Sequence, residues 1–245
     1  MSATPRIHLD APLTAGATLA LPDAAARHVS QVLRLRVGQA LILFDGRGLE
    51  ASAVMVEVQR RSVMVQIESA AIVERESPLA ITLVQAVSKG ERMDWAIQKA
   101  VELGVHRIVP LVCERSVVKL SDERWQKKQA HWQGVIVSAC EQCGRNQLPG
   151  LAEAVDFRSY LAASNAASRW ILAPGEQAGW PDECPPLPLE LLVGPEGGFS
   201  DAEIAAAIKA GAQAVAMGPR VLRTETAAAA ALSAIQASWG DWRRP

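Results

Sequence analysis

Short apolar segments rich in β-branched residues dominate the first 75 positions of the chain. Residues 40–44 form an apolar run, residues 50–58 are apolar at most positions, and residues 61–67 place apolar side chains at alternate positions. An Asp-Gly-Arg-Gly turn signal at 45–48 separates the first two segments. Short strands joined by tight turns predict a small β-barrel or sandwich. One helix is expected within it, over residues 24–33.

The hydrophobic pattern changes after residues 74–78, a charged segment followed by Ser-Pro that we interpret as a linker. Beyond it, apolar runs alternate with segments of helical periodicity, which predicts a parallel sheet with helices on its faces. Gly104 stands where a glycine ends a helix. We therefore expect two domains, 1–73 and 74–245. In the second domain we expect strands at 79–87, 105–112, 169–173, 189–193 and 214–217, and helices at 91–103, 121–140, 201–210 and 226–239.

The composition fits a soluble globular protein. Of 245 residues, 49% are hydrophobic and 21% charged, which excludes a disordered chain. The longest apolar stretch, 227–237, is alanine-rich and too short to span a bilayer, so no membrane association is expected. Four cysteines without a secretory signal predict free thiols and a cytoplasmic protein.

Arginine is unevenly used relative to lysine. Residues 1–75 contain eight arginines and no lysine, and residues 24–44 contain no acid. The planar guanidinium suits phosphates and base edges, so this segment is a candidate RNA contact. The alternative, a solvated polar face at ordinary charge density, stays open. The formal net charge of -1 argues against promiscuous RNA binding rather than against RNA.

The strongest local signal for a ligand site is the glycine-rich segment 194–198. An apolar strand leads into it, and Ser200 with Glu203 forms a capping box at the start of the next helix. Glycines at the carboxyl end of a strand let backbone groups approach a ligand. A valine at Gly197 is therefore expected to block a cofactor. The alternative is a tight turn with no ligand, since the segment is neither a Walker A loop nor a dinucleotide fingerprint.

A second polar cluster precedes an alanine-rich helix. Arg220, Arg223, Thr224, Glu225 and Thr226 crowd together after a Gly-Pro turn at 218–219. One interpretation is a helix cap made by either threonine, with the glutamate offsetting the helix dipole. That interpretation does not explain two arginines beside the threonines, so a ligand site is also considered.

Two other kinds of chemistry are disfavoured. Cys140 and Cys143 form a lone CxxC pair without the further spaced ligands that a zinc site needs, so no metal is expected. A Ser-His-Asp hydrolase is weakly supported, because the chain has no G-x-S-x-G elbow and only four histidines.

These motifs together resemble one known family. The chain is similar to the RsmE-type 16S ribosomal RNA (uracil-N3)-methyltransferases of the SPOUT class, over nearly its whole length. The two most specific segments are GPEGGFS at 194–200 and GPRVLRTET at 218–226. Supporting segments are HVSQVLRLRVG at 28–38, FDGRG at 44–48, KGERMD at 89–94, KAVELGV at 99–105, ERS at 114–116 and EQCGR at 141–145.

The resemblance implies a fold, a reaction and a set of site residues. It implies a PUA-like β-barrel followed by a SPOUT-type parallel sheet with a C-terminal trefoil knot. The protein would act as a homodimer on 16S ribosomal RNA in the small ribosomal subunit, with S-adenosyl-L-methionine as methyl donor. The residues carried over as cofactor contacts are Leu172, Ala173, Gly194, Glu196, Gly197, Met217, Gly218, Leu222, Arg223, Thr224, Glu225 and Thr226. Candidate RNA contacts are Arg27, His28, Arg34, Arg36, Arg47, Lys89, Arg92, Arg115 and Arg145.

The expected chemistry needs a proton acceptor, because N3 of uracil carries a proton at neutral pH. Arg223 is a candidate for stabilising charge that develops on a uracil carbonyl oxygen. Glu225 or Glu196 could accept the proton if burial raises its pKa. Two alternatives remain open: a ribose 2′-O-methyltransferase of the same class, and a non-catalytic RNA-binding module. The identity of the methylated nucleoside separates all three.

Overall fold

The computed structural model describes residues 4–59, 62–116, 122–173 and 179–243 and divides the chain into two compact units. The first unit comprises Met1–Glu76 together with Cys140–Leu148, and the second comprises Ser77–Ala139 and Pro149–Pro245. A short segment from the middle of the chain therefore belongs to the N-terminal unit.

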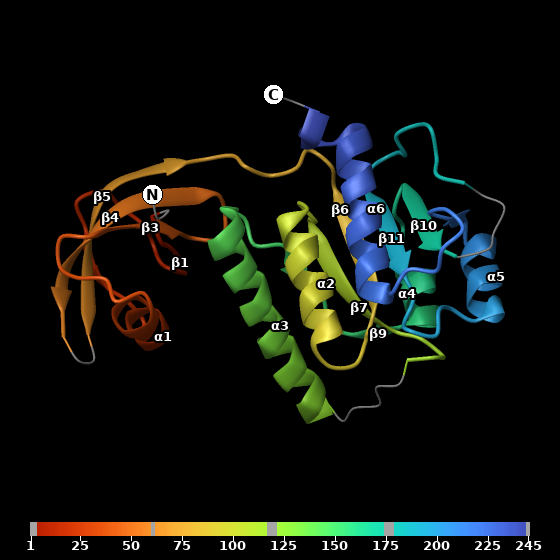
Figure 1. The fold of residues 1–245 in the computed structure, drawn as a ribbon, viewed down its shortest axis with the longest axis horizontal. Coiled ribbons are helices and arrows are strands. Elements are labelled where there is room, and N and C mark those ends of the chain that lie inside the picture. The colour runs from red at the N-terminus through yellow and green to blue at the C-terminus, as the bar shows by residue number, and fades with distance from the viewer. Residues whose placement is uncertain (1–3, 60–61, 117–121, 174–178, 244–245) are drawn as a thin grey trace. The chain divides into compact units, whose positions relative to one another are not determined.

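The first unit is built on a five-stranded sheet (Figure 1). In β5 the alternating residues Val63, Val65 and Ile67 are almost fully buried, which confirms the predicted strand pattern. The strand order is β1-β3-β4-β5-β2; β1 runs parallel to β3 and the other pairs are antiparallel. The strands are β1 (Arg6–His8), β2 (Thr18–Ala20), β3 (Ala40–Phe44), β4 (Leu49–Val58) and β5 (Val63–Ile72).

The helix predicted over residues 24–33 is of two kinds. It begins as the α-helix α1 (Asp23–Arg27) and continues as the π-helix η1 (His28–Val32). The amide of Leu33 donates to the carbonyl of His28, five residues earlier, which widens the second turn. The prediction of one helix over this stretch is confirmed, with a π-helical second half that the sequence did not indicate.

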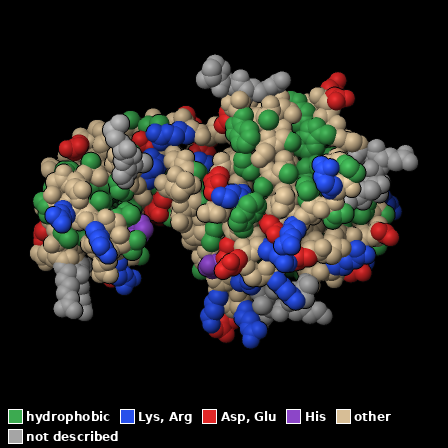
Figure 2. Space-filling model, viewed as in Figure 1, with side chains coloured by type: hydrophobic (Ala, Val, Ile, Leu, Met, Phe, Trp, Pro, Cys, Tyr) green, Lys and Arg blue, Asp and Glu red, His purple; other side chains and the backbone are tan. Residues whose placement is uncertain are grey.

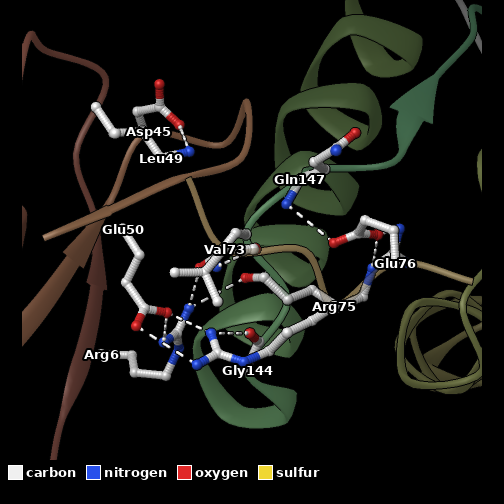
Figure 3. Close-up of polar contacts among 11 residues, drawn as sticks. Arg6, Asp45, Leu49, Glu50, Val73, Arg75, Glu76, Gly144 and Gln147 are labelled. Carbon is white, nitrogen blue, oxygen red and sulfur yellow. Dashed lines mark hydrogen bonds and ion pairs between the residues drawn. The ribbon is translucent and has the colours of Figure 1, made fainter. Parts of the chain in front are cut away.

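A largely buried cluster of ion pairs joins four segments of the first unit (Figure 3). Arg6 donates to the Glu50 carboxylate at 2.7 Å and to Asn146 Oδ1 at 2.5 Å, while Arg75 also pairs with Glu50. Arg145, only 7% exposed, pairs with Glu76 at 2.6 Å. Residues 75 and 76 thus pair within this unit, and the boundary between the two units falls between Glu76 and Ser77, inside the segment 74–78 interpreted as a linker.

Acid is expected to weaken the first unit through Glu50. Burial acts to raise the pKa of Glu50, but hydrogen bonds from Arg75, Arg6 and Asn146 outweigh it and lower the pKa to about 2. Because the folded-state pKa is depressed from 4.5, the stabilisation is complete above pH 4.5 and is lost as the pH falls towards 2. At 1.36 kcal/mol for each pKa unit, the effect is at most about 3 kcal/mol.

Glu50→Gln should abolish this pH dependence and lower stability at neutral pH, because Arg6 and Arg75 lose their charged partner. Hydrogen-exchange protection of β4, measured between pH 2.5 and 7, checks this expectation. The exposed Glu68→Gln is the matched control. Equal pH profiles for Glu50→Gln and the unmodified protein would remove Glu50 as the cause.

The second unit contains a parallel sheet whose order among described residues is β12-β10-β11-β6-β7-β8, with β9 also paired to β7. All the pairs are parallel, which confirms the predicted α/β class. All five residues of β11 are buried, as expected of a strand covered on both faces. The strands are β6 (Ile81–Ala86), β7 (Arg107–Val112), β8 (Gly150–Leu151), β9 (Val155–Asp156), β10 (Ser168–Leu172), β11 (Leu189–Val193) and β12 (Gln213–Val215).

Helices cover the sheet, and α2 and α6 pack against each other (Figure 1). In α2, Met93, Ile97 and Val101 are buried as predicted, and Gly104 follows the helix with a φ of 77°. The helices are α2 (Glu91–Glu102), α3 (Asp122–Cys143), α4 (Phe157–Ala163), α5 (Asp201–Lys209), α6 (Thr224–Trp239) and the 3-10 turn η2 (Asp241–Arg243).

Helix α3 ends three residues beyond its predicted end at 140. Residues 141–143 carry no helix breaker, and the first one is Gly144, whose φ is 90° and whose amide donates to the Cys140 carbonyl. The predicted start at Ser121 lies outside the described residues. Within the described ranges, no helix combines the length and the apolar character needed to cross a bilayer.

Candidate functional site

Three loops form a pocket at one edge of the second unit's sheet. They follow β10, β11 and β12, which are neighbours in the sheet, so their carboxyl ends meet at the same edge. Most of the lining residues are glycine or apolar, and the polar ones are Glu196, Arg220 and Thr224. The lining residues are Leu172, Ala173, Val193, Gly194, Pro195, Glu196, Gly198, Val215, Ala216, Met217, Gly218, Arg220, Val221, Leu222, Thr224 and Ala227.

The glycine-rich loop after β11 is tightly folded. A Cβ added at Gly194 would lie 3.0 Å from the amide nitrogen of Phe199 and 3.2 Å from the carbonyl carbon of Gly198. The loop passes into α5 through the predicted capping box, in which Ser200 and Glu203 bond each other's backbone; this prediction is confirmed. At Gly197 an added Cβ would be at an ordinary 3.5 Å from Arg115. Within the protein itself, an added side chain is therefore crowded by backbone at Gly194 but not at Gly197.

The turn after β7 holds this loop from one side. Arg115 Nη1 donates to the carbonyl oxygens of Gly197, at 2.9 Å, and Phe199, at 3.2 Å. Glu114 accepts from the Ser200 hydroxyl at 2.8 Å, and its own amide donates to Glu203 at 2.8 Å. Arg115, predicted as an RNA contact, is thus engaged in fixing the loop.

Glu196 is held on the other side of the loop. One carboxylate oxygen accepts from Arg92 at 2.8 Å and from the backbone amide of Lys89 at 3.2 Å. Burial acts to raise the pKa of Glu196, but hydrogen bonds from backbone amides and from Arg92 outweigh it and hold the pKa below its usual range. Glu196 was expected to act as a base only if its pKa were raised. Its pKa is lowered instead, so this condition is not met.

Thr224 connects the segment after β12 to the glycine-rich loop after β11. Its hydroxyl donates to the Gly194 carbonyl at 2.6 Å and accepts from the Gln85 side chain at 2.8 Å. Helix α6 begins at Thr224 itself, two residues before the predicted start, and its N-cap position is Arg223, without a side-chain cap bond. The interpretation of Thr224 or Thr226 as a capping residue was wrong, because the Thr224 hydroxyl is used between loops.

The structure gathers eight of the twelve predicted cofactor residues around the pocket. Gly197, Arg223, Glu225 and Thr226 are not part of its lining. Arg220 and Val221 also line it; the resemblance did not supply them as cofactor contacts, although Arg220 belongs to the polar cluster that the sequence marked as a possible ligand site. Its position directly after the Gly-Pro turn at 218–219 was the available signal for Arg220. Gln85 was missed as well, since nothing in the sequence shows that a strand residue will meet Thr224.

The lining is compatible with S-adenosylmethionine. Gly218 has a φ of 77°, and a Cβ added there would meet no atom within 4 Å, so its backbone faces open space that a ligand can enter. Apolar side chains such as Leu172 and Met217 suit an adenine ring, and the Glu196 carboxylate suits a cationic group. The residues present therefore fit the predicted cofactor.

The predicted RNA contacts divide into exposed and engaged side chains. Arg27, His28, Arg34 and Arg36 are exposed on the first unit, and Lys89 is exposed on the second. Arg47 is also exposed, but its guanidinium pairs with Asp10 at 3.0 Å and with Asp45 at 3.5 Å. Arg92 pairs with Glu196 and remains partly exposed. The prediction of Arg145 as an RNA contact is corrected, because its guanidinium is buried against Glu76.

Two further features concern the distribution of charged side chains on the face in Figure 2 and groups of potential metal ligands among the described residues. Positive and negative side chains are interspersed over the face shown in Figure 2 rather than gathered by sign. Among the described residues, no group of three or more His, Cys, Asp or Glu is placed to hold a metal ion. Burial raises the pKa of the Cys140 thiol to about 12, which keeps it protonated at neutral pH and weakens it as a ligand or nucleophile.

Comparison with known proteins gives consistent matches. The family model for an RNA methyltransferase domain matches residues 75–236, and the model for the PUA domain of RNA methyltransferases matches residues 21–68. The ribosomal RNA small subunit methyltransferase E of Buchnera aphidicola from Schizaphis graminum is 33% identical over 97% of each chain. The enzyme of the same name from Bacillus subtilis is 31% identical over 89% of each.

Solved structures are similar over the full length. A putative methyltransferase from Legionella pneumophila, in complex with the bound cofactor SAM, has 44% identity and a TM-score of 0.93 over 98% of this chain and 100% of that one. A ribosomal RNA small subunit methyltransferase E from Neisseria gonorrhoeae, bound to S-adenosyl methionine, has 39% identity and a TM-score of 0.91 over 98% and 99%.

Proposed function

This chain belongs to the RNA methyltransferase family that includes the ribosomal RNA small subunit methyltransferases E, and from that premise we propose that it methylates N3 of a uridine in 16S ribosomal RNA. S-adenosylmethionine is the methyl donor, as the two SAM-bound relatives support. A ribosomal RNA substrate places this work in the bacterial cytoplasm.

The observation that carries the proposal is the three-loop pocket. Both specific segments of the sequence, 194–200 and 218–226, contribute to it, and the Thr224 hydroxyl bonds them together through Gly194. Such a pocket presents backbone groups to a ligand, which suits a cofactor that must be oriented for in-line transfer. The bound cofactor supplies an electrophilic methyl group and a positive charge.

The protein's own residues must stabilise the uracil as it loses the N3 proton. We assign charge stabilisation at a carbonyl oxygen to Arg223, which is exposed beside Thr224 at the start of α6. Of the two glutamates, Glu225 is the better proton acceptor. One of its carboxylate oxygens is buried without a hydrogen-bond partner in the described part of the chain, whereas Glu196 is held by Arg92.

A trefoil knot and a homodimer complete the proposal. The knot would pass the segment 218–226 behind the glycine-rich loop, which the bond between Thr224 and Gly194 supports. The dimer would cover Val221, which lines the pocket and is 81% exposed. An apolar side chain so exposed beside a cofactor site suits burial by a partner.

RNA affinity is expected to depend on the exposed arginines of the first unit. Arg34→Ala should weaken binding of 16S ribosomal RNA about tenfold and leave cofactor affinity unchanged, because Arg34 is exposed and belongs to the other unit. Filter binding and calorimetry measure the two affinities. The control is Arg158→Ala, an exposed arginine outside the predicted contacts. Equal RNA affinity for both variants would exclude Arg34 from the interface.

The proposal as a whole is tested by methyl transfer. The protein is incubated with methyl-labelled S-adenosylmethionine and either purified 16S ribosomal RNA or assembled small subunits. Incorporation into one of these substrates is expected, with 23S ribosomal RNA as the matched control. Absence of transfer to any RNA, with normal cofactor binding, would favour a non-catalytic RNA-binding module instead.

A further inference from the structure

A hollow of about 470 Å³ lies in the first unit, apart from the cofactor pocket of the second unit. It lies between the helical segment α1–η1 and the facing ends of β4 and β5. Pockets that hold small ligands span about 300–1,000 Å³, so the hollow is large enough for one nucleotide. The function proposed above does not use it.

The lining of the hollow combines an apolar floor with a polar rim. Ala26 and Val63 are buried at 4% and 1% exposure, whereas Arg27 and Gln31 are exposed at the rim. Gln59 and Ser62 add polar groups from the opposite side. A primary amide offers both a donor and an acceptor, which is what the edge of a nucleobase requires. The guanidinium of Arg27 supplies a partner for a phosphate.

The backbone beside the hollow has two uncommon features. The π-helix η1 contributes Ser30 and Gln31 to the lining, and π-helical turns are rare in proteins and frequently occur at functional sites. Arg34, two residues after η1, has a φ of 55°, the one non-glycine residue with positive φ in the described ranges. Backbone held in such a conformation costs about 1–3 kcal/mol and often marks a binding site.

The helical wall of the hollow and the segment after it carry apolar and cationic side chains, and one acid, Asp23, also lines the hollow. Val32 and Val37 are 68% and 59% exposed, and Leu33 is 38% exposed. No acid occurs between residues 24 and 44. Exposed aliphatic groups among arginines contact unstacked bases and ribose while the arginines contact phosphates. A protein partner is less well matched, because the hollow itself is polar at its rim.

We propose that this hollow binds one unpaired nucleotide of the RNA substrate, other than the uridine that is methylated. Gln31 reads the edge of its base, Arg27 contacts its phosphate, and the floor of Ala26 and Val63 packs against the base. Sequence-selective proteins commonly bind RNA through bases that lie outside a helix. The inference rests on the proposed RNA substrate. It adds a recognition site in the first unit to the cofactor pocket in the second.

The first test compares two variants that change charge identically. Gln31→Glu replaces the amide nitrogen with an anionic oxygen at the rim, whereas Gln66→Glu does so at an exposed residue of β5 outside the hollow. Gln31→Glu should weaken binding of 16S ribosomal RNA at least tenfold, and Gln66→Glu less than twofold. Both should keep normal cofactor affinity and an unchanged circular dichroism spectrum and thermal unfolding profile, which together report that the second unit and the mutated first unit are folded. Equal effects of the two variants on RNA affinity would overturn the assignment.

The second test identifies the nucleotide. A photo-crosslinking benzophenone side chain is placed at position 31, and the linked position in 16S ribosomal RNA is mapped by arrest of reverse transcription. The expected result is one dominant unpaired nucleotide that differs from the methylated uridine. Crosslinks spread over many positions, or confined to the methylated uridine, would refute a separate site. If the unmodified protein transfers no methyl group to RNA, the proposed function itself fails; if it does and Gln31→Glu binds RNA normally, only the hollow is excluded.

Discussion

Replacing Gly194 with valine is expected to abolish binding of S-adenosylmethionine. The new Cβ would lie 3.0 Å from the Phe199 amide nitrogen and 3.2 Å from the Gly198 carbonyl carbon, both in the loop's own backbone. Neither atom can yield without moving the loop. Calorimetry should show at least a hundredfold loss of affinity, which corresponds to about 2.7 kcal/mol.

The matched control for this variant lies in the same loop. In Gly197→Val the added Cβ meets only Arg115, at 3.5 Å, and the residue does not line the pocket. Its effect on cofactor affinity should stay below fivefold. Circular dichroism should show unchanged secondary structure in both variants. Normal affinity in Gly194→Val would remove the glycine-rich loop from the cofactor site.

Thr224→Val is expected to lower both stability and cofactor affinity, although the two side chains have nearly the same shape. Thr224 is 4% exposed, and its hydroxyl bonds both Gly194 and Gln85. Valine leaves the Gly194 carbonyl without this donor and takes an acceptor from the fully buried Gln85. Loss of such a buried link costs about 2–3 kcal/mol of unfolding free energy. Cofactor affinity should fall about tenfold as the loops separate.

Serine at the same position discriminates the hydroxyl from the methyl group. Thr224→Ser should recover most of the cofactor affinity because the hydroxyl is retained. Thr226→Val, at an exposed residue of the same helix, should leave both quantities unchanged. Denaturant titration and calorimetry measure the two effects. If Thr224→Val and Thr226→Val behave alike, the proposed tie between the loops does not position the cofactor.

Much of the fold follows from local patterns. β3 and β11 have their predicted bounds because each is a short apolar run beside a turn signal. The helical periodicity of α2 and its terminal Gly104 were equally plain. The π-helical turn could not be predicted, because residues 28–32 carry no signal that distinguishes it from an α-helix.

Long-range polar contacts account for the other differences. Arg145 looked like any loop arginine, and only the folded chain brings it to Glu76, 69 positions earlier. The cofactor residues were transferred by resemblance, and their grouping around one pocket depends on the order of β12, β10 and β11 in the sheet. Local spacing carries no information about that order. Gln85 was missed for the same reason.

The most direct test of the central claim is the identity of the methylated nucleoside. Small ribosomal subunits or 16S ribosomal RNA that lack the modification are incubated with the protein and S-adenosylmethionine, digested to nucleosides, and analysed by mass spectrometry against synthetic standards. The account predicts 3-methyluridine in the treated sample and its absence when the protein is omitted. A 2′-O-methylated nucleoside, or no methylated product, would contradict it.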